Sequence, residues 1–485
     1  EIMPSLVGSE MCIRDRNYEV NAQGGNERTK FYTSFGYTKQ EGITLQSGYE
    51  RITGRANMSH KADRVTIEAS TMFTNSTQNV NSEGTSFSSP IMCLAMTASP
   101  STFPYNEDGT FSTSFPALNG ANPLQTATYN YDRSTIVRTL NTLSATWNIW
   151  DNLNIKETLG YDFNQTNNRV WWDPRSNDGR SSKGVFQRYM MNRSKLNTQT
   201  QLTYNKTFAE HHNIDVLLGF ETEDYKYDYT YTNGNTYPSY LPEITNAGVS
   251  RGASNINSYR MTSYLGRLNY DYAGKYLLEG NIRSDASSRF ADGNRWGYFP
   301  SFSAAWRISE EGFMENTKDW LNNLKIRGSW GLLGNQDALT DYYPWMNTYN
   351  LDASYPLGGA LQSGYYQKAY KLSSISWEKS RTWGLGFDAT VNNKINVTFD
   401  YYDRRTTGII MDVPVPAEFG LDAYKDNVGE MSNRGVEVIL SYNNKWGDWS
   451  FGATGNFSYN KNELLDLGLS LDAGGVTADP NNGNK

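Results

Sequence analysis

Two cysteines and three histidines are present among the 485 residues, and long apolar runs are absent. Cys12 and Cys93 give neither a disulfide framework nor a metal-ligand spacing. A helix that crosses a bilayer needs about 18 or more apolar residues. The longest apolar run, residues 91–96, falls far short, which excludes helical membrane spans. The net charge of −7 also argues against a nucleic-acid-binding surface.

Motifs of common enzymes are missing as well. The sequence has no HExxH, GxSxG, Walker or GxGxxG arrangement. His60, His211 and His212 lie in or beside expected short turns, where solvated side chains are a better interpretation than metal ligands. Residues 106–109 place oxygen-bearing side chains in a row without the spacing of a calcium loop, which favours a plain turn. We expect no enzyme, no metal site and no cofactor.

Aromatic residues are abundant instead. They make up 14% of the chain, with 34 Tyr and 13 Trp, while the mean hydropathy is negative. No Pro-rich linker, composition shift or charge block marks a domain boundary, so the chain reads as one repetitive object. A transmembrane β-barrel fits this composition, because only alternate residues of its strands face lipid and because Tyr and Trp collect at the interfaces.

Residues 276–308 show the pattern most clearly. Tyr276, Leu278 and Ile282 alternate with Glu279 and Arg283, so that one face of the predicted strand is apolar and the other is polar. Residues 302–308 repeat this alternation after a polar segment rich in Gly, Asp, Ser and Arg. A packed core would not accept the charges of the second face unpaired. An apolar outside and a polar inside favour a barrel wall in a membrane.

Similar segments recur along the chain and predict about 16 strands, each near the ~10 residues that a tilted membrane-crossing strand requires. Glu157 interrupts an otherwise apolar face, and Leu217 and Leu265 interrupt polar ones; bulges or interfacial positions are two possible reasons. Besides those already named, the expected strands cover residues 18–22, 31–37, 52–58, 65–73, 142–149, 153–163, 196–208, 214–222, 264–272, 324–332, 383–391, 395–401, 436–442 and 449–459.

Short and long connections alternate between these strands, as the periplasmic turns and outside loops of outer-membrane barrels do. The short ones cover residues 24–28, 59–64, 150–152, 209–213, 273–275, 392–394 and 443–448, and the largest long ones cover 75–134, 164–195, 223–260, 333–381 and 403–433. One long connection on the short side, residues 309–323, has helix-like apolar spacing and predicts a small helix. A soluble sandwich does not need this asymmetry.

The chain divides into three parts in this interpretation. Residues 1–16 look like a translated sequencing adaptor and are set aside. Residues 17–467 form part of a barrel, and residues 468–485 are expected to be a truncated loop. The protein is therefore expected to be a fragment.

Several stretches, in order, resemble the SusC/RagA family of TonB-dependent outer-membrane transporters, which is typical of Bacteroidota. They are residues 276–308, 324–336, 377–402 and 427–437, together with the opening 24–37. The resemblance implies an all-β, transmembrane antiparallel barrel of about 22 strands, of which roughly 16 are present here without the internal plug domain. It also implies location in the cell outer membrane and TonB-dependent uptake of oligosaccharides or peptides. The implied partners are a SusD-like surface lipoprotein and the TonB–ExbB–ExbD complex.

Candidate site residues fall into two groups. Aromatic residues in predicted outside loops could stack on sugar rings or peptide side chains, although loop packing and an aromatic girdle remain alternatives: Trp171, Trp172, Tyr229, Tyr231, Tyr342, Tyr343 and Trp345. The second group matches the family motif: Arg283, Asp285, Ser288, Arg289, Phe290, Arg295, Trp296, Gly297, Pro300, Trp306, Gly429, Asn433, Gly435 and Glu437.

Three further alternatives concern these residues or the whole protein. Asp285 and Asp292 have the composition of a glycosidase acid–base pair, but the resemblance places them in a loop without known catalysis. A passive porin would use the same wall without a plug. A secreted β-rich binding or adhesion module would leave the apolar strand faces without lipid to cover them.

Overall fold

The computed structural model describes residues 15–42, 45–80, 99, 101–112, 122–238, 240–339, 341–346, 348–369, 372–414, 418 and 423–467. The segments 1–14 and 468–485, which include most of the supposed adaptor and the supposed terminal loop, lie outside these residues, as do Cys12 and Cys93. The first strand begins at Arg16, within the segment that the sequence analysis set aside.

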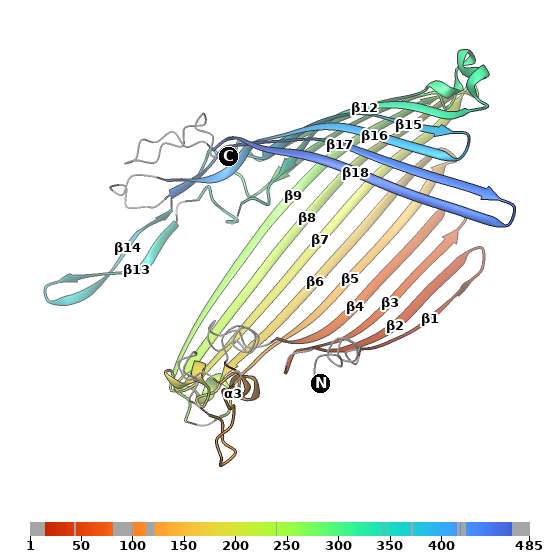
Figure 1. Ribbon diagram of the computed structural model, residues 1–485. Coiled ribbons are helices and arrows are strands. Elements are labelled where there is room, and N and C mark those ends of the chain that lie inside the picture. The colour runs from red at the N-terminus through yellow and green to blue at the C-terminus, as the bar shows by residue number, and fades with distance from the viewer. Residues whose placement is uncertain are drawn as a thin grey trace. The chain divides into compact units, whose positions relative to one another are not determined.

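A 16-stranded antiparallel sheet dominates the structure, and its strands follow one another in chain order (Figure 1). The predicted number of strands is therefore confirmed. The sheet consists of β1 (Arg16–Gly25), β2 (Thr29–Glu41), β3 (Gly48–Ala62), β4 (Val65–Val80), β5 (Tyr131–Trp150), β6 (Leu153–Trp172), β7 (Val185–Phe208), β8 (His212–Asn235), β9 (Val249–Tyr272), β10 (Tyr276–Ser287), β11 (Trp296–Arg307), β12 (Leu321–Asn335), β15 (Glu378–Val391), β16 (Ile395–Pro414), β17 (Ala423–Trp446) and β18 (Trp449–Asp466).

The remaining elements lie in the connections. A separate hairpin pairs β13 (Thr348–Leu357) with β14 (Ala360–Ala369). The helices are short: α3 (Pro123–Tyr129), α4 (Asn177–Arg180), η3 (Ile244–Asn246), η4 (Ile308–Glu310) and η5 (Gly312–Thr317). Among the residues that the structure describes, no helix is long and apolar enough to cross a lipid bilayer.

The chain divides into two compact units. Unit 1 comprises Glu1–Trp147, Glu157–Thr198 and Asp224–Ser258, and unit 2 comprises Asn148–Lys156, Gln199–Glu223 and Tyr259–Lys485. Strands β1–β4 belong to unit 1 and strands β10–β18 belong to unit 2, whereas each of β5–β9 contributes residues to both.

Left-handed backbone conformations close the short connections. Asn392 and Asn393, between β15 and β16, have φ angles of 50° and 53°, and Ala273 and Gly274, between β9 and β10, have φ angles of 52° and 68°. Asparagine and glycine adopt this region at little cost, which explains why such residues end the strands. The short connections predicted from the sequence are confirmed at these positions.

The strands are longer than the ~10 residues expected, since β7, β8, β9 and β17 each have 24. Strand β8 shows the reason. One of its faces changes from Val216, Leu218 and Phe220 to Thr222, Asp224 and Lys226, so the ladder continues after the lipid-facing pattern has ended. Much of the expected long loops 164–195, 223–260 and 403–433 is therefore strand.

The small helix expected in residues 309–323 is present as two 3₁₀ helices, of which η5 lies within the segment and η4 overlaps its start. No bulge accounts for Leu265, since β9 and β10 pair without a register shift. Leu265 instead fills the space that Gly219 leaves open: a Cβ at Gly219 would lie 2.6 Å from Leu265 Cγ. Leu217 and Leu265 line the same hollow, and Glu157 lies exposed within β6.

In unit 2 the register separates two faces, which we call the apolar face and the polar face. The apolar face carries Leu278, Phe302 and Trp330 among its residues, and the polar face carries Glu279, Arg327 and Asp400. Side chains of the apolar face are exposed: Phe302 is 55% exposed and Ile282 is 54% exposed. Contiguous exposed apolar surface of this kind requires a cover, and lipid provides it in a barrel wall.

Aromatic pairs bound the apolar face at both ends of β10 and β11. Tyr276 stacks on Trp306 at 6.3 Å, and Tyr264 stacks on Trp296 at 6.0 Å. Eight residues separate Trp306 from Tyr298 and ten separate it from Trp296, which corresponds to about 27–33 Å along a strand. At the ~40° tilt of barrel strands this is roughly 20–26 Å in height, close to the ~25 Å apolar band of outer-membrane barrels, with aromatic girdles at its two edges.

One carboxylate connects the 3₁₀ segment to the Tyr276–Trp306 pair. Glu311 Oε1 accepts hydrogen bonds from the Tyr276 hydroxyl at 2.7 Å and from Trp306 Nε1 at 3.1 Å, and its other oxygen lies 3.5 Å from Lys275 Nζ. The Tyr276 hydroxyl, followed by the Trp306 indole and Lys275, holds the pKa of Glu311 below its usual value.

A lowered pKa in the folded state gives a pH dependence of known sign. The contribution of Glu311 is present above the usual carboxyl pKa and is lost as the pH falls through the lowered value. We expect Glu311→Gln to raise hydrogen exchange of residues 308–317 at pH 7, after correction for intrinsic rates. The difference between the wild-type protein and the variant should shrink as the pH is lowered from 7 to 3. An equal difference between the two proteins at both pH values would contradict this assignment.

Candidate functional site

Charged side chains from three neighbouring strands form an ion-pair network on the polar face of unit 2. Arg327 of β12 lies between two carboxylates, with Nε 3.2 Å from Asp388 of β15 and Nη2 2.7 Å from Asp400 of β16. Lys325 Nζ adds a second cation, 3.0 Å from Asp388. Gly386 makes this possible, because a Cβ there would lie 2.5 Å from Asp400 Oδ1. The glycine lets the guanidinium and the carboxylate lie flat against the wall.

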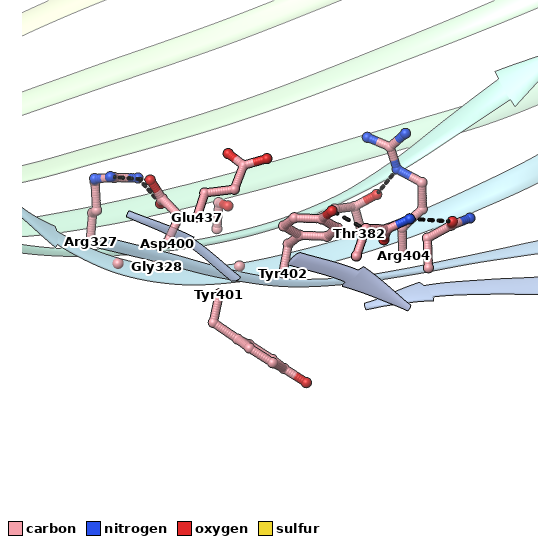
Figure 2. Close-up of a pocket in the computed structure, with 13 residues that line it drawn as sticks. Arg327, Gly328, Thr382, Asp400, Tyr401, Tyr402, Arg404 and Glu437 are labelled. Atoms are coloured by element: carbon pink, nitrogen blue, oxygen red, sulfur yellow. Dashed lines mark hydrogen bonds and ion pairs between the residues drawn. The ribbon is translucent and has the colours of Figure 1, made fainter. Parts of the chain in front are cut away.

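A polar hollow of about 630 Å³ lies beside this network, formed by β12 and β15–β18. Figure 2 shows the side chains of Arg327, Asp400, Glu437 and Arg404 on one side of the sheet and that of Tyr401 on the other, as strand alternation requires. The lining residues are Arg327, Gly328, Ser329, Thr382, Gly384, Gly386, Asp400, Tyr401, Tyr402, Arg404, Asn433, Glu437 and Asn460.

Within the hollow, Tyr402 lies across the wall. Its hydroxyl donates to Asn460 Oδ1 at 3.2 Å and would lie 2.6 Å from a Cβ at Gly435. Arg404 Nε donates to Thr382 Oγ1 at 3.3 Å. Considering only the residues with a described position, neither Arg404 nor Glu437 takes part in an ion pair. The hollow thus offers one cation, one carboxylate, amides and hydroxyls, which suits contact with a polar molecule and not a covalent reaction.

The first half of the motif anchors the connection between β10 and β11. Arg283 lies 2.8 Å from Asp285 and 3.2 Å from Glu221, on β8. Ser288 Oγ accepts from the Arg260 backbone N–H at 2.9 Å. Asp292 lies 2.9 Å from Arg295. Asp285 and Asp292 therefore each have an arginine partner of their own, which supports a structural role over an acid–base pair.

Arg289 joins this connection to the one between β12 and β13. Its side chain is only 6% exposed, lies 5.2 Å from the Tyr342 ring centre and 5.9 Å from that of Tyr259, and donates to the Leu339 carbonyl. Trp345 Nε1 adds a hydrogen bond to the Ser288 carbonyl at 3.2 Å. Arg289 thus holds two outer connections together and does not line an open barrel entrance.

Phe290 is the centre of the apolar cluster beneath these connections. It is fully buried and packs with Phe299, Leu339, Ile375 and Trp377. Trp377 Nε1 donates to the Arg295 carbonyl at 3.0 Å. Gly297 must lack a side chain here, since a Cβ would lie 2.3 Å from Phe299 Cζ.

The other motif residues lie in the strands. Pro300 pairs with Ile282 in the ladder, while Trp296 and Trp306 belong to the two aromatic pairs of the apolar face. Asn433 Oδ1 accepts from Asn462 Nδ2 at 2.8 Å, and Asn433, with Glu437, lines the hollow. Gly429 faces Met411, whose Sδ would lie 2.6 Å from a Cβ at that position.

Predicted cargo-contacting aromatics have three different environments. Trp171 and Trp172 end β6, and Tyr229 and Tyr231 lie in β8, so these four residues are in strands and the prediction that they lie in loops is wrong. Trp171 is 3% exposed and packs with Phe186 and Tyr237, in the loop-packing role that was the alternative for it. Tyr342, Tyr343 and Trp345 do lie in an outer connection, where Tyr343 and Trp345 pack edge to face at 6.4 Å.

Other polar groups were also located. His60 accepts or donates a hydrogen bond with Thr29 at 2.7 Å, and His212 does so with Tyr270 at 2.8 Å. The described part of the chain contains no group of three or more His, Cys, Asp or Glu side chains that could hold a metal ion. At residues 106–110, Asp108 Oδ1 accepts from the Thr110 backbone and hydroxyl, as in a turn.

The sequence analysis missed the network around Arg327, the hollow, and a clamp in unit 1. In the clamp, the Arg175 guanidinium lies 3.9 Å from the Tyr129 ring centre and 4.0 Å from that of Tyr240, and Asp173 accepts two hydrogen bonds from it at 2.8 Å. Charges at polar positions of neighbouring strands were a usable signal for the network. The clamp left no local signal, because its rings come from distant connections.

Comparisons with known proteins identify the relatives of this chain. A family model described as TonB dependent receptor-like, beta-barrel, matches residues 94–485. TonB-dependent receptor P39 of Formosa agariphila is 29% identical over 468 residues, covering 92% of this chain and 42% of the relative. TonB-dependent receptor SusC of Bacteroides thetaiotaomicron is 26% identical over 483 residues, covering 93% of this chain and 47% of the relative. The chain thus spans about half the length of these relatives.

Solved structures agree on the fold. The structure of the RagAB peptide transporter superposes with a TM-score of 0.82 at 22% identity, covering 94% of this chain and 52% of that one. The siderophore receptor PirA from Acinetobacter baumannii superposes with a TM-score of 0.57 at 10% identity, covering 93% of this chain. The apolar and polar faces belong to the wall of an outer-membrane barrel, and the family consists of transporters and receptors, not enzymes. This chain belongs to the TonB dependent receptor-like β-barrel family.

Proposed function

We propose that the whole protein is a SusC-type nutrient importer of the outer membrane, driven through TonB, that takes up oligosaccharides or peptides. The polar face carries the proposal: it combines neutralised charges, an open polar hollow, and Arg404 and Glu437, which form no ion pair within the described part of the chain, on strands whose other face suits lipid. A wall of this composition suits a water-filled passage for polar cargo.

Two partners follow from the same proposal. A SusD-like surface lipoprotein would deliver cargo at the outer connections, and the TonB–ExbB–ExbD complex would supply energy from the inner membrane. Two of the related proteins, TonB-dependent receptor SusC and the RagAB peptide transporter, support this proposal. A passive pore remains the competing function, and it differs in needing no energy.

Uptake in cells with and without TonB separates the two functions. The full-length gene would be expressed in a Bacteroidota host whose own SusC-type genes are deleted, together with any adjacent SusD-like gene. We expect growth on a mixture of oligosaccharides and peptides to require both the gene and tonB. Growth that requires the gene but continues in the tonB deletion would contradict the importer and favour a passive pore.

A further inference from the structure

Four tyrosines from two neighbouring strands of unit 1 form a continuous strip of rings, which we call the tyrosine strip: Tyr189 of β7 with Tyr227, Tyr229 and Tyr231 of β8. The Tyr227 and Tyr229 rings are stacked, with their centres 6.3 Å apart and their planes at 21°. Tyr189 lies 4.8 Å from Tyr231 and 6.5 Å from Tyr229. Because these β8 residues alternate, their rings share one face of the strand.

The strip is not part of a packed core. All four tyrosines are half-buried, and none belongs to the buried clusters around Phe290 or Trp171. Polar groups border the rings: the Tyr189 hydroxyl donates to Gln187 Oε1 at 3.1 Å, and Asn233 Nδ2 donates to the Tyr231 hydroxyl at 2.9 Å. Arg193 adds a guanidinium 5.4 Å from the Tyr227 ring centre. Partly open rings with an amide border are typical of a binding surface.

The backbone around the strip restricts the class of ligand. Strand β8 lies between β7 and β9 in the sheet, so its backbone N–H and C=O groups are used by its neighbours. An extended peptide bound by strand addition would need an open edge. The ligand must therefore be recognised by side chains, which here are ring faces, hydroxyls, amides and the Arg193 guanidinium. Sugar rings match this surface, because each presents a C–H face for stacking and hydroxyls at its rim for hydrogen bonds.

We infer that the tyrosine strip is a stacking platform for successive sugar rings of an oligosaccharide cargo. The inference rests on the proposed importer and selects its substrate class. Removal of one ring should weaken binding on the order of fivefold, and removal of two should weaken it by roughly 20-fold or more, since each stacked ring contributes about 1 kcal/mol. Phenylalanine keeps the ring, so Tyr→Phe variants should bind nearly as well as the wild type.

The test uses the full-length protein, purified in detergent, with three variants. Tyr227→Ala/Tyr229→Ala removes two rings, Tyr227→Phe/Tyr229→Phe keeps them, and Lys226→Ala/Thr230→Ala alters exposed residues at the alternate positions of the same strand. The probes are oligosaccharides from partial acid hydrolysis of starch, xylan and laminarin, and tryptic peptides of casein. Folding of each variant is checked by its heat-dependent mobility in gel electrophoresis.

We expect the wild type, the double phenylalanine variant and the Lys226/Thr230 variant to bind oligosaccharides. The double alanine variant should lose this binding. Retention of casein peptides alone, retention of neither probe, or oligosaccharide retention that survives the double alanine change would overturn the inference. The growth assay separates this failure from that of the importer. TonB-dependent growth that the double alanine variant still supports leaves the importer intact and refutes the platform, whereas loss of TonB dependence refutes the importer.

Discussion

Replacement of Phe302 by arginine is expected to lower the free energy of unfolding by about 2–4 kcal/mol, the cost of a cation on the lipid face of a barrel at mid-membrane. Phe302 lies four residues from Trp306 and four from Tyr298, midway between the two aromatic edges of the apolar face. It is paired with Gly280 and Trp330, so its side chain has no polar neighbour in the ladder. Denaturant titration of the full-length protein in phospholipid vesicles measures the effect.

Two matched variants control for the added bulk and charge. Ser303→Arg places the same cation on the polar face, opposite Glu279 and Ser329, and should change the free energy of unfolding little. Tyr298→Arg places it at the edge of the band, where the cost falls to about 0–1 kcal/mol. A larger loss from Ser303→Arg than from Phe302→Arg would mean that the faces have been assigned in reverse.

Replacement of Phe290 by alanine is expected to destabilise the outer connections by about 3–5 kcal/mol, since it empties the centre of a buried cluster. The ring is 0% exposed and packs 5.0 Å from the Trp377 ring centre. Arg289 precedes Phe290 in the chain, so the change should also loosen the contacts of Arg289 with the Tyr342 ring and the Leu339 carbonyl. Hydrogen exchange of residues 286–296 and 336–346 measures the free energy of local opening.

Phe313→Ala is the control, because it makes the same substitution at an exposed position. Phe313 is 69% exposed, and its removal should leave exchange in those two segments unchanged. Unaltered exchange in the Phe290→Ala protein would show that the motif does not hold the connections together. Its role would then have to be sought in direct contact with cargo.

The alternation of apolar and polar residues was sufficient to predict the strands, because the two faces of each barrel strand are visible in its local sequence. The 276–308 segment illustrates this: the predicted apolar positions within β10 and β11 lie on the apolar face, with Tyr276 opposite Trp306, and only Ile308 differs, because it begins η4. Strand length could not be predicted in the same way. Beyond Phe220 the pattern loses its apolar face, yet the ladder of β8 continues to Asn235, held by neighbouring strands that the local sequence does not reveal.

Candidate site residues were predicted less well, for a related reason. The motif around Arg289 was found, but the partners that bury its guanidinium lie some 50 residues away, at Leu339 and Tyr342. Only the tertiary contacts show that each arginine of the motif has a partner. Tyr229 and Tyr231 are half-buried residues of a strand, whereas Trp171, which the sequence does not distinguish from them, is buried.

The two faces also connect the fold to transport. Glycines on the polar face, such as Gly386 and Gly435, let Arg327 and Tyr402 lie along the wall, so charges are neutralised without closing the hollow. The same strands expose Phe302 and Ile282 on the other side. A wall with these properties can separate lipid from a polar passage, which is what an importer requires.

Cysteine labelling along β10 tests this central claim most directly. Single cysteines would replace residues 277–283 one at a time, in full-length protein lacking the natural cysteines and present in intact outer membranes. A water-soluble maleimide and a lipid-soluble maleimide would then compete for each position. The account predicts that Leu277, Glu279, Asn281 and Arg283 positions take the water-soluble reagent and that Leu278, Gly280 and Ile282 take the lipid-soluble one. Equal labelling of both sets by the water-soluble reagent would contradict a membrane-spanning wall.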